Sequence, residues 1–126
     1  MFSHVILGTN NIEKSKAFYN ALLGALGAKP GVTDDKGRLM FVHEDKIFGL
    51  TPPIDGQPAT HGNGSTIGFA CKSAEQVDAW HEAGVANGGK SIEDPPGVRE
   101  SAFGPLYLAY LRDPEGNKLC ALYVMS

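Results

Sequence analysis

The stretch HVILG at residues 4–8 recurs later in the chain as TIGFA at residues 66–70. The match continues without a gap through the segment that follows each copy, where Phe18 aligns with Trp80. A unit that is repeated once ordinarily folds into two similar halves that bury their apolar faces against each other. We therefore expect one pseudo-symmetric domain, residues 1–126, in which a site between the halves draws on equivalent positions of both.

The composition of the chain is that of an ordinary globular domain. Hydrophobic residues make up 42% and charged residues 20% of the 126 residues, which is enough to build one apolar core. The net charge of -3 offers no basic face for phosphate backbones, so no nucleic-acid partner is expected. No apolar run is long enough to span a membrane, and the first residues lack the pattern of a secretion signal. We therefore predict no membrane partner and a cytoplasmic location.

The apolar spacing divides each copy of the repeat into a strand, a helix and a hairpin. In the first copy the predicted strand, helix and hairpin strands cover residues 3–8, 12–26, 38–43 and 46–50. In the second copy they cover residues 65–71, 74–86, 106–112 and 118–124. A stretch rich in proline and glycine separates the copies, which sets module one at about 1–52, the linker at about 53–63 and module two at about 64–126. Helices that alternate with hairpins predict an α+β fold with mixed strand pairing.

The sequence DPEGN at residues 113–117 lies between the last two predicted strands. Asp before Pro, followed by Gly116 and an Asn that tolerates a left-handed backbone, is typical of a tight reversal. This turn resembles the D-P-x-G-N signature of the glyoxalase/bleomycin-resistance/extradiol-dioxygenase superfamily, whose members are also called vicinal oxygen chelate proteins. The first strand with His4, and the helix with Phe18 and Tyr19, are similar to the first module of that family.

The resemblance covers the whole chain and carries expectations for its fold and its assembly. It implies two tandem βαβββ modules that form a curved mixed sheet around a cleft. It also implies a homodimer, because a second chain often completes the cleft in relatives.

The resemblance also places four positions at which metal-dependent relatives hold a divalent metal. On this chain they are His4 and Thr66 on the first strands, and Phe48 and Cys120 on the last strands. Relatives with a working metal centre mostly carry His, Gln or Glu there, and a catalytic metal needs three or more protein ligands. Because only His4 matches, as a weak candidate, a divalent metal is disfavoured and no cofactor is predicted.

The first strand of each module predicts which side chains meet a ligand. Side chains alternate along a strand, so Val5 and Phe69 should face the helices. His4 and Gly68 should then face the cleft, where small residues leave room for a ligand. In the alternative interpretation, this space is filled by aromatic side chains from Phe41, Phe48, Tyr107 or Tyr110.

Cys120 and His4 are the candidates for catalysis. A cysteine becomes a nucleophile when a neighbouring base or cation lowers its pKa, and His4 is the candidate base. The plainer alternatives are an inert buried thiol and a hydrogen-bonded histidine. Arg99 follows a proline-rich loop and is a candidate clamp for a small carboxylate or phosphate, or else pairs with acidic neighbours.

These expectations favour a glyoxalase-like protein with an incomplete metal site that binds or sequesters a small organic molecule in its cleft, as drug-binding resistance proteins of the superfamily do. The alternative is a metal-dependent lyase or isomerase of the lactoylglutathione-lyase type, and a dioxygenase is less well supported. A non-catalytic protein that binds a partner through a sheet edge is a third class. The predicted ligand-contacting residues are His4, Phe48, Thr66, Gly68, Arg99, Tyr107, Tyr110 and Cys120.

Overall fold

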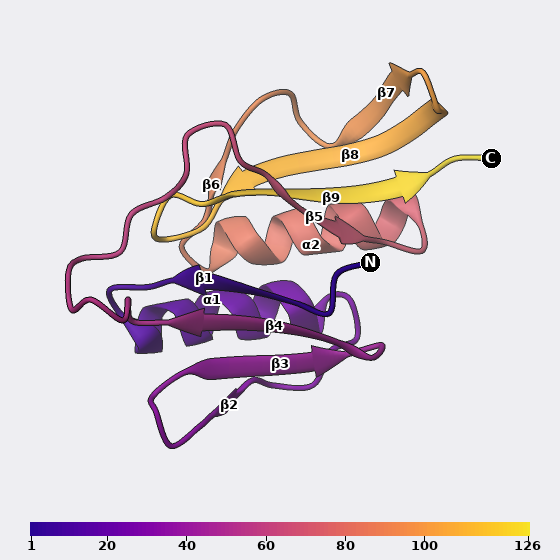
Figure 1. Cartoon of the computed structure of the whole chain (residues 1–126). Helices are drawn as coiled ribbons and strands as arrows, with labels where there is room; N and C mark the ends of the chain where they lie inside the picture. The colour runs from indigo at the N-terminus through magenta and orange to yellow at the C-terminus, as the bar shows by residue number, and fades with distance from the viewer.

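The computed structural model describes residues 1–126 and consists of two halves of the same design (Figure 1). The first half contains β1 (His4–Gly8), α1 (Ile12–Gly24), β2 (Val32–Thr33), β3 (Leu39–His43) and β4 (Lys46–Thr51). The second half contains β5 (Ile67–Ala70), α2 (Ala74–Ala86), β6 (Lys90–Ser91), β7 (Gly97–Ser101), β8 (Gly104–Arg112) and β9 (Lys118–Val124). The α+β class that the repeat predicts is confirmed.

Three strands lie where the residue spacing predicts only turns and loops, although the βαβββ modules implied by the resemblance include a third strand after each helix. β2 and β6 are two residues long, which is too short for an alternating pattern to be visible. β7 has the sequence GVRES, in which Val98 is the only large apolar residue. These strands form through pairing with longer neighbours, so their own residue pattern carries little signal.

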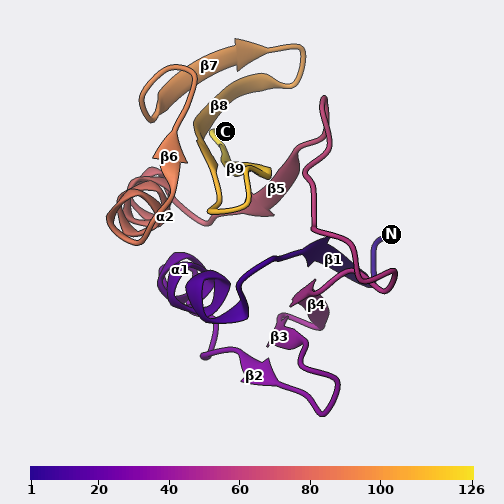
Figure 2. The same cartoon turned by 90° about the vertical axis from the view of Figure 1, so that its left-hand side faces the viewer.

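Each module contributes its own sheet. The strand order is β1-β4-β3-β2 in the first sheet and β5-β9-β8-β6 in the second, where β7 also pairs with β8. β1 and β4 are parallel, and so are β5 and β9, because a helix carries the chain across the sheet after each first strand. β1 and β5 are therefore the edge strands of two separate sheets, and they face each other across the boundary between the modules (Figures 1 and 2).

The two helices lie beside each other on one side of the sheets (Figures 1 and 2). The Asn11 side chain accepts a hydrogen bond from the Lys14 backbone N–H, and the Ser73 side chain accepts one from Gln76, so each helix begins at a side-chain cap. Neither helix has the length and the apolar composition that crossing a bilayer would require.

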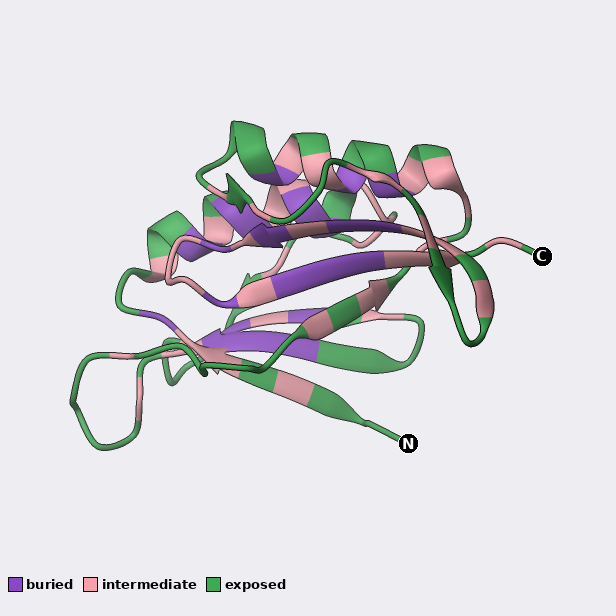
Figure 3. Cartoon of the chain, turned by 90° about the horizontal axis from the view of Figure 1, so that it is seen from above, coloured by how far each residue is buried: buried purple, intermediate pink, exposed green.

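A chain of aromatic rings crosses the core from one module to the other. The Phe48 ring on β4 lies 4.9 Å from that of Tyr19 on α1 and 5.4 Å from that of Phe69 on β5, measured between centroids. The Phe69 ring in turn lies 6.1 Å from that of Trp80 on α2. Tilted and edge-to-face contacts of this kind stabilise a core beyond the area that they bury. The buried residues gather where the helices meet the strands, so the core lies between the helix layer and the two sheets (Figure 3).

The DPEGN turn fastens the second module to the first. Asp113 Oδ2 accepts hydrogen bonds from the Tyr19 hydroxyl on α1 at 2.5 Å and from Asn117 Nδ2 at 2.9 Å. Asp113 Oδ1 accepts two more, both at 2.9 Å, from the backbone N–H groups of Glu115 and Asn117. The Glu115 carboxylate accepts hydrogen bonds from Thr9 and from the backbone and side chain of Asn10, in the loop before α1. The turn therefore has a structural role, which agrees with its reading as a tight reversal.

Candidate functional site

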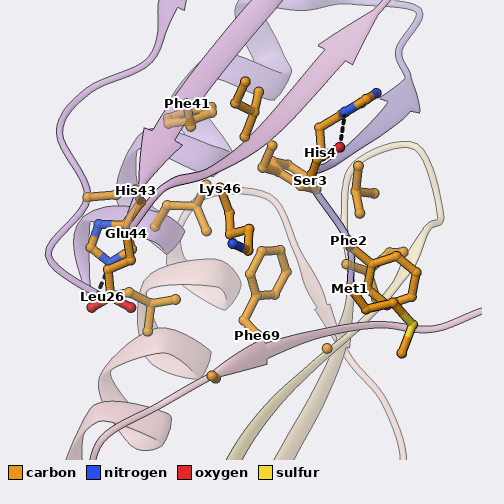
Figure 4. A pocket seen from close by; sticks show the side chains of 18 residues that line it. Met1, Phe2, Ser3, His4, Leu26, Phe41, His43, Glu44, Lys46 and Phe69 are labelled. Carbon is orange, nitrogen blue, oxygen red and sulfur yellow. Dashed lines mark hydrogen bonds and ion pairs between the residues drawn. The ribbon is translucent and has the colours of Figure 1, made fainter.

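A cavity of about 680 Å³ lies between the two modules, at the end of the sheets where β1 begins and where β3 turns into β4 (Figure 4). Its walls come from both halves of the chain and are mostly apolar. The side chains that form the apolar wall include those of Val5, Leu23, Leu26, Phe41, Phe48, Ile67 and Phe69.

Strand alternation explains why this cavity is apolar. Val5 on β1 pairs in register with Phe48 on β4, and Phe48 pairs with Phe41 on β3, so these side chains share the helix-facing side of the first sheet. Phe69 on β5 also faces the helices, where its ring contacts those of Phe48 and Trp80. Since no hydrogen bonds join the edges of β1 and β5, the two apolar layers leave a slot between them.

The β3–β4 hairpin brings charged groups to the mouth of this cavity. Glu44 and Asp45 form its two-residue turn with positive φ angles of 48° and 65°, the backbone of a type I′ turn. Glu44 Oε1 lies 2.9 Å from the Nζ atom of Lys72, a residue that follows β5 in module two. The same oxygen lies 3.8 Å from His43 Nε2. The hydrogen bond from Lys72 and the charges of Lys72 and His43 lower the pKa of Glu44, so Glu44 stays ionised and links the two modules across the mouth.

His4, Phe48 and Gly68 are the predicted site residues that line this cavity. His4 is exposed, and its Nδ1 lies 2.8 Å from Ser3 Oγ; in Figure 4 its ring turns toward Ser3 rather than toward the interior. Thr66 is exposed, precedes β5 and does not line the cavity.

Phe48 does not lie on the sheet face on which the sequence alignment places it. It is 9% exposed and belongs to the core, because it pairs with Val5 on the helix-facing side. Cys120 pairs with Gly68, on the side of β9 that faces away from the helices. The position in module one that matches Cys120 is therefore Gly49, which pairs with Ile6, and the prediction for Phe48 was wrong by one residue.

Cys120 and Tyr110 pair with each other on the open face of the second sheet, which is the face turned away from the helices. Cys120 is 5% exposed, and burial raises the pKa of its thiol although the Tyr110 hydroxyl lowers it in part. The thiol is therefore protonated at neutral pH and is a poor nucleophile. His4 belongs to the other sheet and is engaged by Ser3, so the structure does not assemble the predicted Cys120–His4 pair.

Two other predicted site residues have local structural roles. The Arg99 guanidinium donates hydrogen bonds of 3.0–3.1 Å to the backbone carbonyls of Asp94, Pro95 and Gly97, so it holds its own loop. Tyr107 faces α2, where its hydroxyl donates a 2.8 Å hydrogen bond to Asp78 Oδ1. The placement of Tyr107 in the cleft was wrong, because alternation along β8 puts Tyr107 on the helix side and Tyr110 on the open side.

The residues at the four family positions do not fit a family-type metal centre. The position in module one that matches Cys120 is Gly49, which has no side chain to bind a metal, and His4 and Cys120 lie on different sheets. No group of three or more His, Cys, Asp or Glu side chains converges anywhere in the structure. A catalytic metal needs about three protein ligands, and the residues at these positions supply fewer.

Known proteins share both the sequence pattern and the fold of this chain. The family model described as the Glyoxalase/Bleomycin resistance protein/Dioxygenase superfamily matches residues 1–121. The chain belongs to this superfamily. A glyoxalase/bleomycin resistance protein from Albidiferax ferrireducens T118 is 60% identical, with a TM-score of 0.95, over 98% of this chain and 99% of that one.

More distant solved structures share the fold of this superfamily member. A glyoxalase/bleomycin resistance protein/dioxygenase family enzyme from Burkholderia phytofirmans PsJN is 21% identical, with a TM-score of 0.74, over 98% of each chain. A glyoxalase-related enzyme from Fulvimarina pelagi is 17% identical, also with a TM-score of 0.74, over 98% of this chain and 88% of that one. A search of curated proteins finds no match.

Sequence reasoning missed the residues that define the cavity in this superfamily member. Glu44 lies at the tip of the predicted hairpin and is exposed, but its carboxylate also reaches Lys72 of module two beside the cavity. Phe69 was correctly assigned to the helix-facing layer, but that layer becomes a cavity wall at the sheet edge. The position of Lys46 could have been predicted from the sequence. It is two residues before Phe48, so both side chains lie on the same side of β4.

Proposed function

We propose that this protein binds a small, largely apolar molecule in the cavity between its two modules, without a metal. The observation that supports this proposal is the cavity itself. Its volume of about 680 Å³ lies within the range of roughly 300–1,000 Å³ that is typical of small-molecule sites. Its lining is apolar, with a few polar groups at the mouth, which is the usual composition of such sites.

The polar groups of the cavity suit binding better than catalysis. Glu44 is engaged by Lys72, and His4 is engaged by Ser3, so neither is aimed at a substrate atom. A lyase or isomerase of the glyoxalase type requires a positioned base and a group that stabilises a developing oxyanion. Glu44 and His4, which are held by these partners, do not supply such a pair.

The probe for this proposal is N-phenyl-1-naphthylamine, an uncharged aromatic dye that fluoresces in apolar surroundings. We expect saturable enhancement with a dissociation constant of about 10 µM, as ligand-efficiency limits for a molecule of this size suggest. Neither EDTA nor added zinc should change the titration. Ala28→Phe, which places a ring in the cavity, should weaken binding about tenfold or more, whereas Ala102→Phe in the exposed β7–β8 turn should not. No enhancement with the wild type, or enhancement that needs zinc, would refute the proposal.

We further propose that the protein forms a homodimer through the outer face of its first sheet. Ile6, Val42 and Ile47 share this face and expose 37%, 67% and 37% of their surface. A contiguous apolar patch of this kind is typical of a contact between chains. Light scattering should give twice the chain mass for the wild type and for Val85→Glu, an exposed control on α2, but the mass of one chain for Val42→Glu. A monomeric wild type would contradict this proposal.

A further inference from the structure

One lysine side chain at the mouth of the cavity forms no ion pair with the protein. On the basis of the proposed function, we infer that the ligand of this cavity is an apolar molecule with a single carboxylate, which the ammonium group of Lys46 receives. The location of Lys46, the charges around it and the apolar lining support this inference independently of one another.

Lys46 lies at the mouth of the cavity, at the start of a strand. It is the first residue of β4 and pairs with His43, and strand alternation places it on the same side as Phe48, which faces the core. In Figure 4 its side chain extends into the cavity toward Phe69. The residue is exposed, so its ammonium group lies at the mouth of the cavity, where water and a ligand can both reach it.

No anion of the protein accompanies Lys46. Glu44 and Lys46 are the charged side chains, besides histidines, that line the cavity. The Glu44 carboxylate is already engaged by Lys72 at 2.9 Å, and His43 lies 3.8 Å from it. Lys46 takes part in no ion pair. A ligand carboxylate beside Lys46 would gain a charge-assisted hydrogen bond at the edge of an apolar site.

The same arrangement disfavours a second negative charge inside the cavity. Beyond Lys46 the wall consists of Phe41, Phe48 and Phe69, which suit a hydrocarbon chain or an aromatic ring. A second carboxylate would be placed either against these rings, where an unpaired charge is costly, or beside the ionised Glu44. The chemistry therefore fits a monocarboxylic acid such as a medium-chain or aromatic acid.

Competition experiments with sodium octanoate and octan-1-ol test this inference, because the two molecules differ in the carboxylate. Each molecule is titrated against dye-bound wild-type protein and against the variants Lys46→Met and Lys46→Arg. The control variant is Lys36→Met in the turn before β3. We expect Lys46→Met to weaken octanoate binding about fivefold to tenfold while octanol binding stays within twofold. Lys46→Arg and Lys36→Met should retain octanoate binding.

The outcomes separate this inference from the function on which it rests. If the wild type does not bind the dye, the proposed function fails. If the dye binds but octanoate does not displace it, or if Lys46→Met weakens octanoate and octanol equally, the ligand is not a carboxylate held by Lys46 and only the inference is overturned. Thermal melts of all variants show whether a change in affinity follows from a loss of folding.

Discussion

Asp113→Ala is expected to lower the free energy of unfolding by about 3–5 kcal/mol, because it removes the acceptor of a buried hydrogen-bond network. Asp113 is 5% exposed, and its carboxylate accepts hydrogen bonds from Tyr19, Asn117 and Glu115. Alanine leaves these donors without partners in a site that water reaches poorly. The Tyr19 hydroxyl is the most affected, since Tyr19 is fully buried.

Urea unfolding, followed by circular dichroism, measures this loss. The control is Asp35→Ala in the exposed turn before β3, which should change stability by less than about 0.5 kcal/mol. Tyr19→Phe should cost about 1–2 kcal/mol alone, and much less in the Asp113→Ala background, because both substitutions remove the same hydrogen bond. A loss below about 1 kcal/mol for Asp113→Ala would show that the turn does not fasten the modules together.

Much of the fold could be predicted because local signals and the repeat agree. The helix that begins after the Ser73 cap has the predicted bounds 74–86, and the hairpin around Glu44 and Asp45 lies where the sequence places it. The inward assignment of Val5 and Phe69 is also correct, since both pack against the core. Alternation with a period of two gives these assignments without knowledge of the tertiary structure.

The errors at the site have two physical causes. Phe48 was aligned with Cys120, one position away from Gly49, and a slip of one residue along a strand moves a side chain to the opposite face of the sheet. The second cause concerns the boundary between the modules. No residue pattern states how far apart the edges of β1 and β5 lie, so the cavity between them follows only from the packing of the two modules.

Gly84→Val is expected to destabilise the protein by about 2–3 kcal/mol through overpacking between the helices and the second sheet. A Cβ atom at Gly84 would lie 2.5 Å from Leu111 Cδ2 on β8 and 3.0 Å from Leu22 Cδ1 on α1. Both leucines are fully buried, so neither side chain has space into which it can move. Gly84 is therefore a point at which α2 approaches both neighbours closely.

The matched control is Gly24→Val at the end of α1, where a new Cβ would have no atom within 4 Å. The same substitution there should change stability by less than about 0.5 kcal/mol, because valine removes glycine's backbone freedom in the unfolded chain and meets no obstacle in the folded one. Urea unfolding of the two variants separates the steric effect at Gly84 from the general effect of replacing a helical glycine. If both variants have the same stability, α2 shifts at little cost and the close approach of the helices does not hold the two modules in place. In that case the cavity between β1 and β5 would depend on the Tyr19–Asp113 hydrogen bond and the Glu44–Lys72 ion pair for its shape.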